Sequence, residues 1–328
     1  MTSFEDVLLT RVPASEESIA RGFLPGARVL REGLSEATSD VHSDVRVLAV
    51  SAMDRVEPSA LARMPALVGV VTRSDGYDHL PDAWLVSRGL PGLSLHGYAT
   101  DSVAHHAVSM ILALLHRMPE GALRTREGSW KREDLAGRSL LDVTVGVLGV
   151  GRIGSRVARH VLALGGRVLG HDLRRDPTLS DAPGFRWAGS LDELLAGSDV
   201  LTVHVPLTAT TRGMLGAREL SKLPPGAALV NTARGALLDA PAVEAALRGG
   251  RLSGFAADVL SGEPDPPDLR RFADLPNVLL TPHLAAYDAR TIAARYEHTA
   301  AACRALLGND VATVARLAVC GARPRAVA

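Results

Sequence analysis

A glycine-rich segment near the middle of the chain, residues 149–154, most limits the fold that this sequence can adopt. It reads Gly-Val-Gly-Arg-Ile-Gly, follows a short apolar run at 145–148, and leads into a stretch with helical periodicity. Glycines in this spacing allow a tight strand-to-helix turn, a close approach of backbone to a pyrophosphate, and close packing of helix on strand. The segment therefore predicts a βαβ unit that binds a dinucleotide at a helix N-terminus.

An acidic residue completes this pattern. Asp172 ends a second apolar run, residues 167–171, and follows the last glycine by about the 20 residues that are typical of dinucleotide-binding units. Its carboxylate can accept hydrogen bonds from the adenosine ribose and would repel a 2′-phosphate, so the predicted cofactor is NAD. Arg174 and Arg175 leave NADP open, because an arginine here can bind a 2′-phosphate. The alternative, a glycine-rich turn without a ligand, gives no reason for strand, helix and acid to occur together.

Length and composition fit a cytoplasmic α/β protein. The chain has 328 residues, 47% of them apolar and 22% charged, which suffices for about two domains with sizeable cores. The formal net charge is zero, so electrostatics favours neither nucleic acid nor an acidic membrane as a partner. Cys303 and Cys320 make neither a disulfide framework nor a metal site, and no basic segment precedes an apolar one at the start. We therefore expect a small-molecule substrate and no metal.

Short apolar runs alternate with helical patterns along the whole chain. Near-continuous apolar strands separated by helices are typical of a parallel sheet covered on both faces. Predicted strands lie at 7–9, 45–50, 67–71, 145–148, 168–170, 200–203, 228–230, 254–257 and 278–280. The loop 261–267 is too rich in proline for a helix or an inner strand.

Two predicted helices, at 102–117 and 289–307, mark where the chain divides. Asp288 suits the N-cap of the second, because its carboxylate can accept from free N–H groups of the first turn. We expect a discontinuous substrate (catalytic) domain of residues 1–100 plus 288–328, into which a NAD-binding Rossmann domain of residues 101–287 is inserted. The expected fold class is α/β with two Rossmann-like, doubly wound parallel-sheet domains, and a cleft between them would hold the substrate.

Three polar residues follow the ends of three successive predicted strands. Arg234 comes after 228–230, Glu263 lies in the loop after 254–257, and His283 follows 278–280. Since ligands bind beyond the carboxyl ends of strands in such sheets, we expect the three side chains to converge on one nicotinamide face.

These side-chain types suit the reduction of a 2-oxo acid. An imidazolium at His283 can stabilise the carbonyl oxygen and protonate it. A carboxylate at Glu263 favours the charged ring and fixes it, and the guanidinium of Arg234 matches a substrate carboxylate and polarises the oxo group. Each residue alone has a structural explanation, such as a packing histidine or a solvated surface charge, and only the joint placement favours catalysis.

Several longer segments resemble the D-isomer-specific 2-hydroxyacid dehydrogenase family over nearly the whole chain. Beside the glycine segment, these are His-Val-Pro-Leu-Thr at 204–208, Asn-Thr-Ala-Arg-Gly-Ala-Leu-Leu-Asp at 231–239, Ala-Asp-Val-Leu-Ser-Gly-Glu-Pro at 257–264 and Thr-Pro-His at 281–283. Residues 72–78, 101–104 and 283–287 are most similar to the D-lactate dehydrogenase branch, above all to the vancomycin-resistance D-lactate dehydrogenases. The resemblance implies an NAD-dependent oxidoreductase that interconverts a 2-oxo acid and a D-2-hydroxy acid.

The resemblance also implies individual site residues. The catalytic trio of the family maps onto Arg234, Glu263 and His283. The implied cofactor-binding residues are Gly149, Gly151, Arg152, Ile153, Gly154, Asp172, His204, Val205, Pro206, Thr211, Thr232, Ala233 and Asp258, the last as a contact of the nicotinamide carboxamide. The implied substrate-binding residues are Asp75, Gly76, Tyr98, Ala286 and Tyr287.

Two of these positions depart from the family pattern. Asp75 replaces an apolar residue and brings a carboxylate near the expected substrate carboxylate, where two charges about 4 Å apart would repel by about 4 kcal/mol at an effective dielectric near 20. Either Asp75 points away or pairs with Arg73, or the substrate carries an amine or several hydroxyls. Ala286 replaces a bulky aromatic, which suggests a 2-oxo acid larger than pyruvate.

Other functions and the oligomeric state stay open at this point. Enzymes of this fold also act on D-3-phosphoglycerate, on hydroxypyruvate or glyoxylate, and on phosphite. Asp75 disfavours a phosphorylated substrate, and it stands where the resemblance implies a lysine for phosphite oxidation. A non-catalytic, NAD-sensing regulator would also keep the fold. The helix at 102–117, rich in Val, Ile, Leu and Met, favours a homodimer, although burial between the domains explains its composition equally well.

Overall fold

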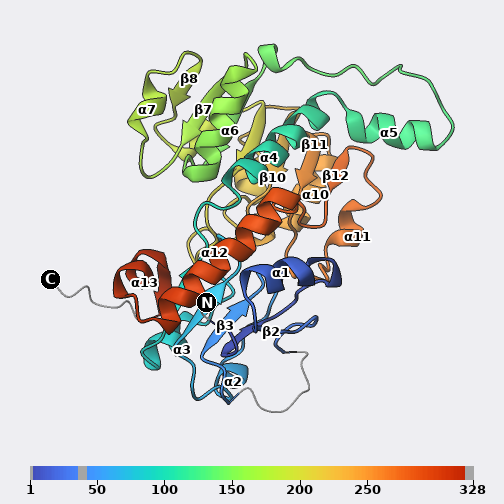
Figure 1. The fold of residues 1–328 in the computed structure, drawn as a ribbon. Helices are drawn as coiled ribbons and strands as arrows, with labels where there is room; N and C mark the ends of the chain where they lie inside the picture. Colours follow the sequence, from blue (N-terminus) through green and yellow to red (C-terminus); the bar gives the residue numbers. More distant parts are fainter. Residues whose placement is uncertain (1–2, 36–42, 322–328) are drawn as a thin grey trace. The chain divides into compact units, whose positions relative to one another are not determined.

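The computed structural model describes residues 3–35 and 43–321, and the chain divides into two compact units (Figure 1). The first unit comprises Met1–Ala99 and Asp288–Ala328, and the second comprises Thr100–Tyr287. Each contains a largely or wholly parallel sheet, and the second is inserted into the sequence of the first, which confirms the predicted α/β fold class.

The sheet of the second unit is parallel throughout. Its order is β12-β11-β10-β9-β6-β7-β8. The strands are β6 (Thr144–Leu148), β7 (Arg167–His171), β8 (Phe185–Trp187), β9 (Val200–Val203), β10 (Ala227–Asn231), β11 (Leu252–Ala257) and β12 (Val278–Leu280). The strand order reverses between β6 and β9, and in such sheets a ligand binds at this switch point, beyond the carboxyl ends of the strands.

Helices cover both faces of this sheet. They are α4 (Thr100–Leu115), α5 (Met118–Arg126), α6 (Arg152–Ala163), α7 (Pro177–Ser180), α8 (Leu191–Ala196), α9 (Ala217–Leu220), α10 (Ala240–Arg248) and α11 (Leu269–Phe272), with short 3-10 turns at Leu140–Asp142 and Gly235–Leu237. Successive strand residues point to opposite faces, so Val230 packs in the cluster with α4 and α6, whereas Leu229 packs in the cluster with α8 to α10. This two-sided burial explains the continuous apolar runs in the sequence.

The first unit has the strand order β13-β5-β4-β3-β1-β2. The strands are β1 (Val7–Leu9), β2 (Arg28–Val29), β3 (Val47–Val50), β4 (Gly69–Thr72), β5 (Pro91–Ser94) and β13 (Ala318–Gly321). The helices are α1 (Glu17–Phe23), after a 3-10 turn at Ala14–Glu16, α2 (Pro58–Leu61), α3 (Asp82–Ser87), α12 (Ala289–Leu307) and α13 (Val311–Leu317). Only β13 runs antiparallel in the part of this sheet that the structure describes.

The prediction for the long C-terminal helix is confirmed at both ends. The α12 helix spans the predicted residues 289–307, and Asp288 caps it by accepting from the N–H of Thr291 at 2.9 Å. Four strands, β2, β5, β8 and β13, were not predicted, because each is short and contains a glycine, proline or charged residue. Within the described ranges, none of the helices combines the length and apolarity needed to cross a membrane.

Candidate active site

The glycine segment forms the turn between β6 and α6. Gly149 has a φ of +89°, a left-handed backbone that favours glycine, and a Cβ there would lie 2.7 Å from the carbonyl carbon of His204. A Cβ on Gly154 would lie 1.9 Å from the carbonyl oxygen of Gly149. A Cβ on Gly151 would instead meet nothing within 4 Å. Two glycines are thus required by the packing of the protein, while the third leaves open space at the start of α6.

This turn has the features that a dinucleotide pyrophosphate needs. Gly151 is the N-cap of α6, and no side chain in the described part of the protein caps the helix there, so its first N–H groups and their partial positive charge face the open space. Asp172 lies beside the turn, where it accepts from the N–H groups of Val150 at 2.7 Å and Arg174 at 2.9 Å. The carboxylate is therefore held in place at the carboxyl end of β7.

A buried hydroxyl at the end of β10 also fits a ligand. Thr232 is buried, and its Oγ1 has no hydrogen-bond partner among the residues that the structure describes. A buried polar atom without a partner costs free energy, so such atoms mark places where a ligand or water completes the hydrogen bonding. Together with the open space at Gly151, this atom shows that the residues present fit NAD.

His204 follows β9 at the switch point of the sheet. Its Nε2 lies 2.9 Å from the hydroxyl of Thr202, and its N–H donates to the carbonyl of Leu148 at 2.7 Å. Burial lowers the pKa of His204 to about 4, so the ring is neutral near pH 7. Thr211 closes the following loop, because its hydroxyl donates to the carbonyl of Pro206 at 2.7 Å.

His283 and Glu263 form a direct pair. Nδ1 of His283 lies 2.6 Å from Oε2 of Glu263, whose Oε1 accepts from the N–H of Leu260 at 2.9 Å. About a quarter of each side chain is exposed, 25% for the histidine and 21% for the glutamate. Because the carboxylate occupies Nδ1, Nε2 is the nitrogen left to exchange a proton with another molecule.

The backbone of His283 is itself unusual. Its φ is +55°, a left-handed conformation that costs a non-glycine residue about 1–2 kcal/mol. The N–H of His283 donates to the carbonyl of Asp258 at 2.9 Å. Surrounding contacts therefore hold the histidine in a conformation that it would not adopt alone.

Arg234 lies in a tightly bonded turn after β10. The side chain of Asn231 fixes this turn twice, since its Nδ2 donates to the carbonyl of Arg234 at 2.9 Å and its Oδ1 accepts from the N–H of Ala233 at 3.0 Å. The guanidinium in turn donates to the carbonyl of Ala233 at 2.8 Å.

Gly235 brings this turn against the loop that carries Glu263. A Cβ on Gly235 would lie 2.1 Å from the carbonyl carbon of Leu260, so only glycine allows this approach of two backbones. The structure thus brings the loops of Arg234 and Glu263 together.

Asp258 is buried and anchors the loop that follows β12. Its carboxylate accepts from the N–H groups of Leu284 at 2.7 Å and Ala285 at 2.9 Å, and from the Thr281 hydroxyl. Burial would raise the pKa of Asp258, but hydrogen bonds from His106, Thr281 and the backbone outweigh it and hold the pKa below its usual value. These contacts show a role within the protein that the sequence did not predict, and the carboxamide contact stays a prediction.

In the first unit, the predicted substrate residues lie in loops at the carboxyl edge of the sheet. Asp75 and Gly76 follow β4, and Tyr98 follows β5. Oδ2 of Asp75 accepts from the N–H of Gly97 at 3.2 Å, and its Oδ1 lies 3.6 Å from Nδ1 of His96. The Asp75 carboxylate therefore ties the two loops together.

Arg73 does not pair with Asp75, contrary to one alternative from the sequence. Its guanidinium is buried and donates to the hydroxyl of Tyr296 at 3.2 Å and to the carbonyl of Thr10. The hydroxyl of Tyr296 donates onward to Glu16 at 2.7 Å. Sequence reasoning could not find this network, because its members lie far apart in the chain and charged residues are usually exposed.

Ala286 and Tyr287 end the second unit. Ala286 is half-buried and the Tyr287 side chain is 47% exposed. Their predicted contact with a substrate stays a prediction.

Comparison with known proteins identifies the family. Residues 108–285 match the family described as D-isomer specific 2-hydroxyacid dehydrogenase, NAD binding domain. The chain belongs to this family. Both the predicted family and the predicted cofactor, NAD, are confirmed.

Proteins named for different dehydrogenase activities are similar to this chain. The D-3-phosphoglycerate dehydrogenase of Archaeoglobus fulgidus is 32% identical over 85% of the chain, which spans about half (53%) of that protein. The D-specific alpha-keto acid dehydrogenase of Enterococcus faecalis is 34% identical over 71% of the chain and 74% of its own length. A crystal structure of the D-lactate dehydrogenase of Aquifex aeolicus, complexed with NAD and lactic acid, superposes with a TM-score of 0.89 at 29% identity, covering 96% of this chain and 99% of that one.

Proposed function

We propose that this protein is an NAD-dependent oxidoreductase that interconverts a 2-oxo acid and the D-2-hydroxy acid. The observation that carries the proposal is the 2.6 Å contact between His283 and Glu263, at the carboxyl edge of a sheet that belongs to an NAD binding domain. The turn that carries Arg234 packs against the loop that carries Glu263, through the close backbone approach at Gly235.

The three side chains divide the chemistry among them. A bound NADH would supply the hydride that reduces the oxo carbon. His283 donates a proton from Nε2 to the oxo oxygen, and in the reverse direction takes it back from the hydroxyl. Glu263 holds Nδ1 and stabilises the charged ring, and Arg234 binds the substrate carboxylate and polarises the oxo group.

We assign cofactor binding to residues 101–287 and substrate recognition to residues 1–100 with 288–328. Asp172 supports NADH over NADPH, since its fixed carboxylate would repel a 2′-phosphate. The guanidinium of Arg175 lies 5.9 Å from the ring centroid of Trp187, a contact that engages one of the two arginines that left NADP open. Asp75 favours a substrate side chain that bears an amine or several hydroxyls over a phosphorylated one, and Ala286 favours a side chain larger than that of pyruvate.

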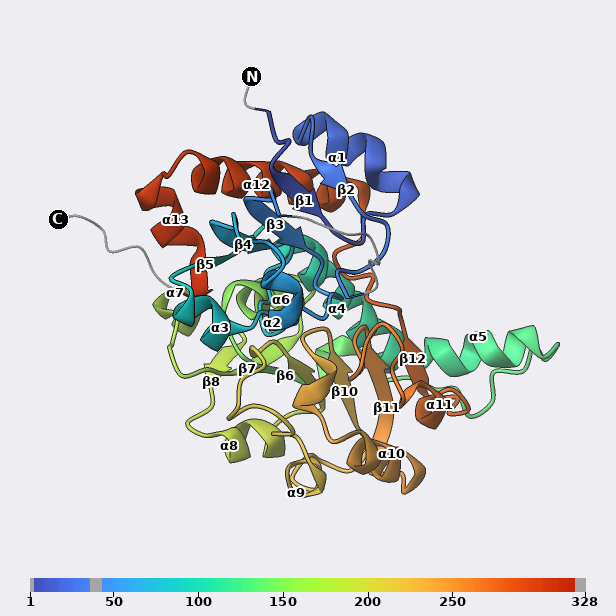
Figure 2. The same cartoon turned by 90° about the horizontal axis from the view of Figure 1, so that it is seen from below.

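We also propose that the protein forms a homodimer, but on different grounds from the composition of α4. The apolar residues of α4 pack against α6, β10 and β11 of its own unit, so they need no partner. By contrast, α5 has no buried residue and, with the segment after it, extends away from its unit's sheet (Figure 1 and Figure 2). Met118 is 60%, Leu123 40% and Trp130 90% exposed.

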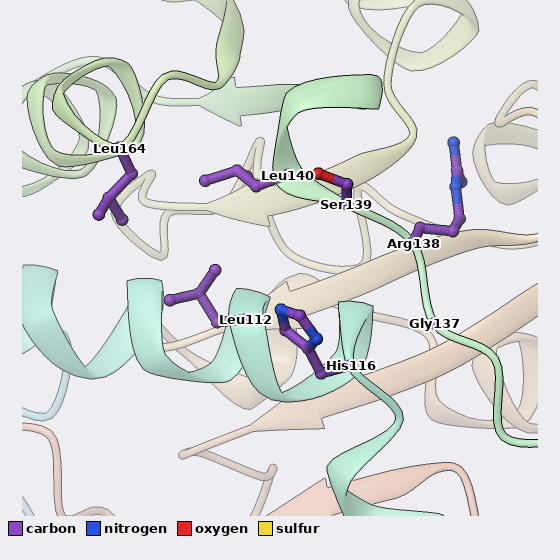
Figure 3. Close-up of a pocket in the computed structure, with 7 residues that line it drawn as sticks. All are labelled: Leu112, His116, Gly137, Arg138, Ser139, Leu140 and Leu164. Carbon is purple, nitrogen blue, oxygen red and sulfur yellow. The ribbon is translucent and has the colours of Figure 1, made fainter. Parts of the chain in front are cut away.

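A hollow near this arm supports a second copy of the chain as the partner. It has a volume of about 430 Å³ and lies between α4 and the segment before β6, as Figure 3 shows. Its lining residues are Leu112, His116, Gly137, Arg138, Ser139, Leu140 and Leu164. Exposed apolar side chains beside a partly apolar hollow are typical of a self-complementary interface. Sedimentation of the wild-type chain and of Trp130→Ser tests this, and a monomeric wild type would contradict it.

The catalytic proposal is tested by following NADH and NADPH oxidation across a panel of 2-oxo acids. The panel runs from glyoxylate and pyruvate through branched, aromatic and amino-bearing acids. We expect NADH-dependent turnover that is best with an acid larger than pyruvate and is lost in His283→Ala. Tight NADH binding without turnover of any acid would contradict the proposal and indicate an NAD-sensing regulator.

A further inference from the structure

Two polar side chains of α4 contact the loop that carries His283. The hydroxyl of Ser102 donates to the carbonyl of Ala285 at 2.6 Å. Nε2 of His106 lies 3.1 Å from Oγ1 of Thr281 and 3.5 Å from Oδ1 of Asp258. Residues four apart in a helix lie on the same face, so α4 presents both groups to one loop.

The hydrogen-bond directions show what His106 does. The hydroxyl of Thr281 donates its only hydrogen to Oδ1 of Asp258. At the contact between Thr281 and His106, the hydroxyl oxygen must therefore accept, and Nε2 of His106 must carry the proton and donate it. His106 thus supports the carboxylate of Asp258 through Thr281 and, at longer range, directly.

This support reaches His283 through the backbone on both sides of it. The backbone carbonyl of Asp258 accepts from the N–H of His283. The Asp258 carboxylate accepts from the N–H groups of Leu284 and Ala285. Ser102 binds the other side of Ala285. Because His283 has a φ of +55°, relaxation of this loop would release the strained backbone and turn the ring away from Glu263.

We propose that His106 and Ser102 are positioning residues for His283. They act by holding the loop 281–285 so that Nδ1 of the imidazole stays on Glu263. This role in catalysis rests on the proposed function, whereas the positioning itself is a property of the protein that can be measured without turnover.

The kinetic test compares matched variants on the same helix. His106→Phe removes the donor, His106→Gln keeps a donor near the place of Nε2, and the control is His105→Phe, an exposed neighbour. Ser102→Ala is matched with Ser109→Ala, which removes an exposed hydroxyl that donates to the carbonyl of His105 in the same helix. We expect kcat to fall about 10- to 100-fold in His106→Phe, with KM and the NADH affinity nearly unchanged, since small misplacements of a catalytic group have effects of this size. His106→Gln should recover most of the loss, Ser102→Ala should lose less, and both controls should resemble the wild type.

A spectroscopic test separates this proposal from the proposed function. In histidine-labelled protein, the proton between Nδ1 of His283 and Glu263 should give a downfield NMR signal that is absent in His283→Ala. We expect it to be lost or broadened in His106→Phe, restored in His106→Gln and unchanged in His105→Phe. A signal that persists in His106→Phe would overturn the positioning role, as would an equal loss of kcat in the His105→Phe control. If the signals behave as expected but the wild type turns over no 2-oxo acid, the positioning stands and the proposed function fails.

Discussion

Close backbone contacts at glycines, with one buried carboxylate, Asp258, shape the carboxyl edge of the sheet in the second unit, whereas a network of buried charged side chains shapes the same edge in the first. In the second unit, Gly149, Gly154 and Gly235 let backbones approach where a Cβ would collide. In the first unit, the charges of Arg73 and Glu16 are buried around the hydroxyl of Tyr296. The carboxyl edges of the two sheets are therefore held by different kinds of contact. In the second unit, the backbone contacts keep polar side chains available to bind a ligand. In the first unit, the polar side chains are bonded to one another and stabilise the unit.

The largest expected effect is on catalysis at the second edge. His283→Ala should lower kcat by about 10³-fold or more, because it removes the proton donor, while the free energy of unfolding changes little. Glu263→Gln should lower kcat by less, since the amide keeps a neutral contact with the ring but cannot stabilise its charge. Steady-state kinetics and thermal unfolding measure the two effects. A stable, fully active His283→Ala would show that the edge does not perform the proposed chemistry.

The next effect is on stability at the first edge. Glu16→Leu removes the carboxylate that accepts from Arg295 and Tyr296 and leaves buried cations unpaired, which should cost about 3–5 kcal/mol in the free energy of unfolding. NADH affinity should stay unchanged. The control is Glu17→Leu at the neighbouring, more exposed position, which should change stability little. Urea unfolding and NADH fluorescence titration make the comparison, and equal losses in both variants would argue against a special role of the buried network.

A pair of glycine variants tests the close backbone contacts of the glycine turn. Gly154→Ala should destabilise the protein by about 3 kcal/mol, because its Cβ would lie 1.9 Å from the Gly149 carbonyl oxygen. Gly151→Ala meets only open space, so it should leave stability unchanged and weaken NADH binding about 10-fold or more by filling the place of the pyrophosphate. If NADH bound to Gly151→Ala with the affinity of the wild type, the open space would not be the cofactor site.

The smallest effect is a pH dependence at the second edge, where the half-buried His204 is neutral rather than charged near pH 7. The unfolded chain protonates His204 below its ordinary pKa near 6.5, whereas the folded chain does so only near pH 4. Stability should therefore fall as the pH decreases from about 6.5 towards 4. Between pH 7 and pH 5 the wild type should lose about 1–2 kcal/mol more than His204→Gln. Denaturant unfolding at both pH values measures this, and parallel losses would show that His204 titrates normally.

The two edges also differ in how far the sequence predicts them. In the second unit, the glycine turn and the strands β6 and β9 follow from local patterns, since each depends on residues near in sequence. In the first unit, the same holds for α12 with its cap at Asp288. The pairing of His283 with Glu263 was expected from strand ends and agrees with the structure. The burial of Arg73 could not be predicted, because it depends on Thr10 and Tyr296, which only the fold brings near.

The role of His106 could be predicted from the sequence only in part. It lies four residues after Ser102 on a helix that otherwise buries apolar side chains, so a polar pair on that face was a signal that the sequence contained. Its partners, Thr281 and Asp258, lie at the ends of different strands and became visible only in the structure.

The insertion of one unit into the other has a consequence for synthesis on the ribosome. The second unit is a continuous segment and can fold once residue 287 has left the ribosome. The first unit cannot, because its β5 pairs with β13 and its core needs α12, and both of these are made after the second unit. Although residues 1–99 are made before the second unit, their apolar strands must stay exposed until the segment from residue 288 onward has been made. We expect nascent chains halted before α12 to resist protease in the second unit and to bind chaperones through the first.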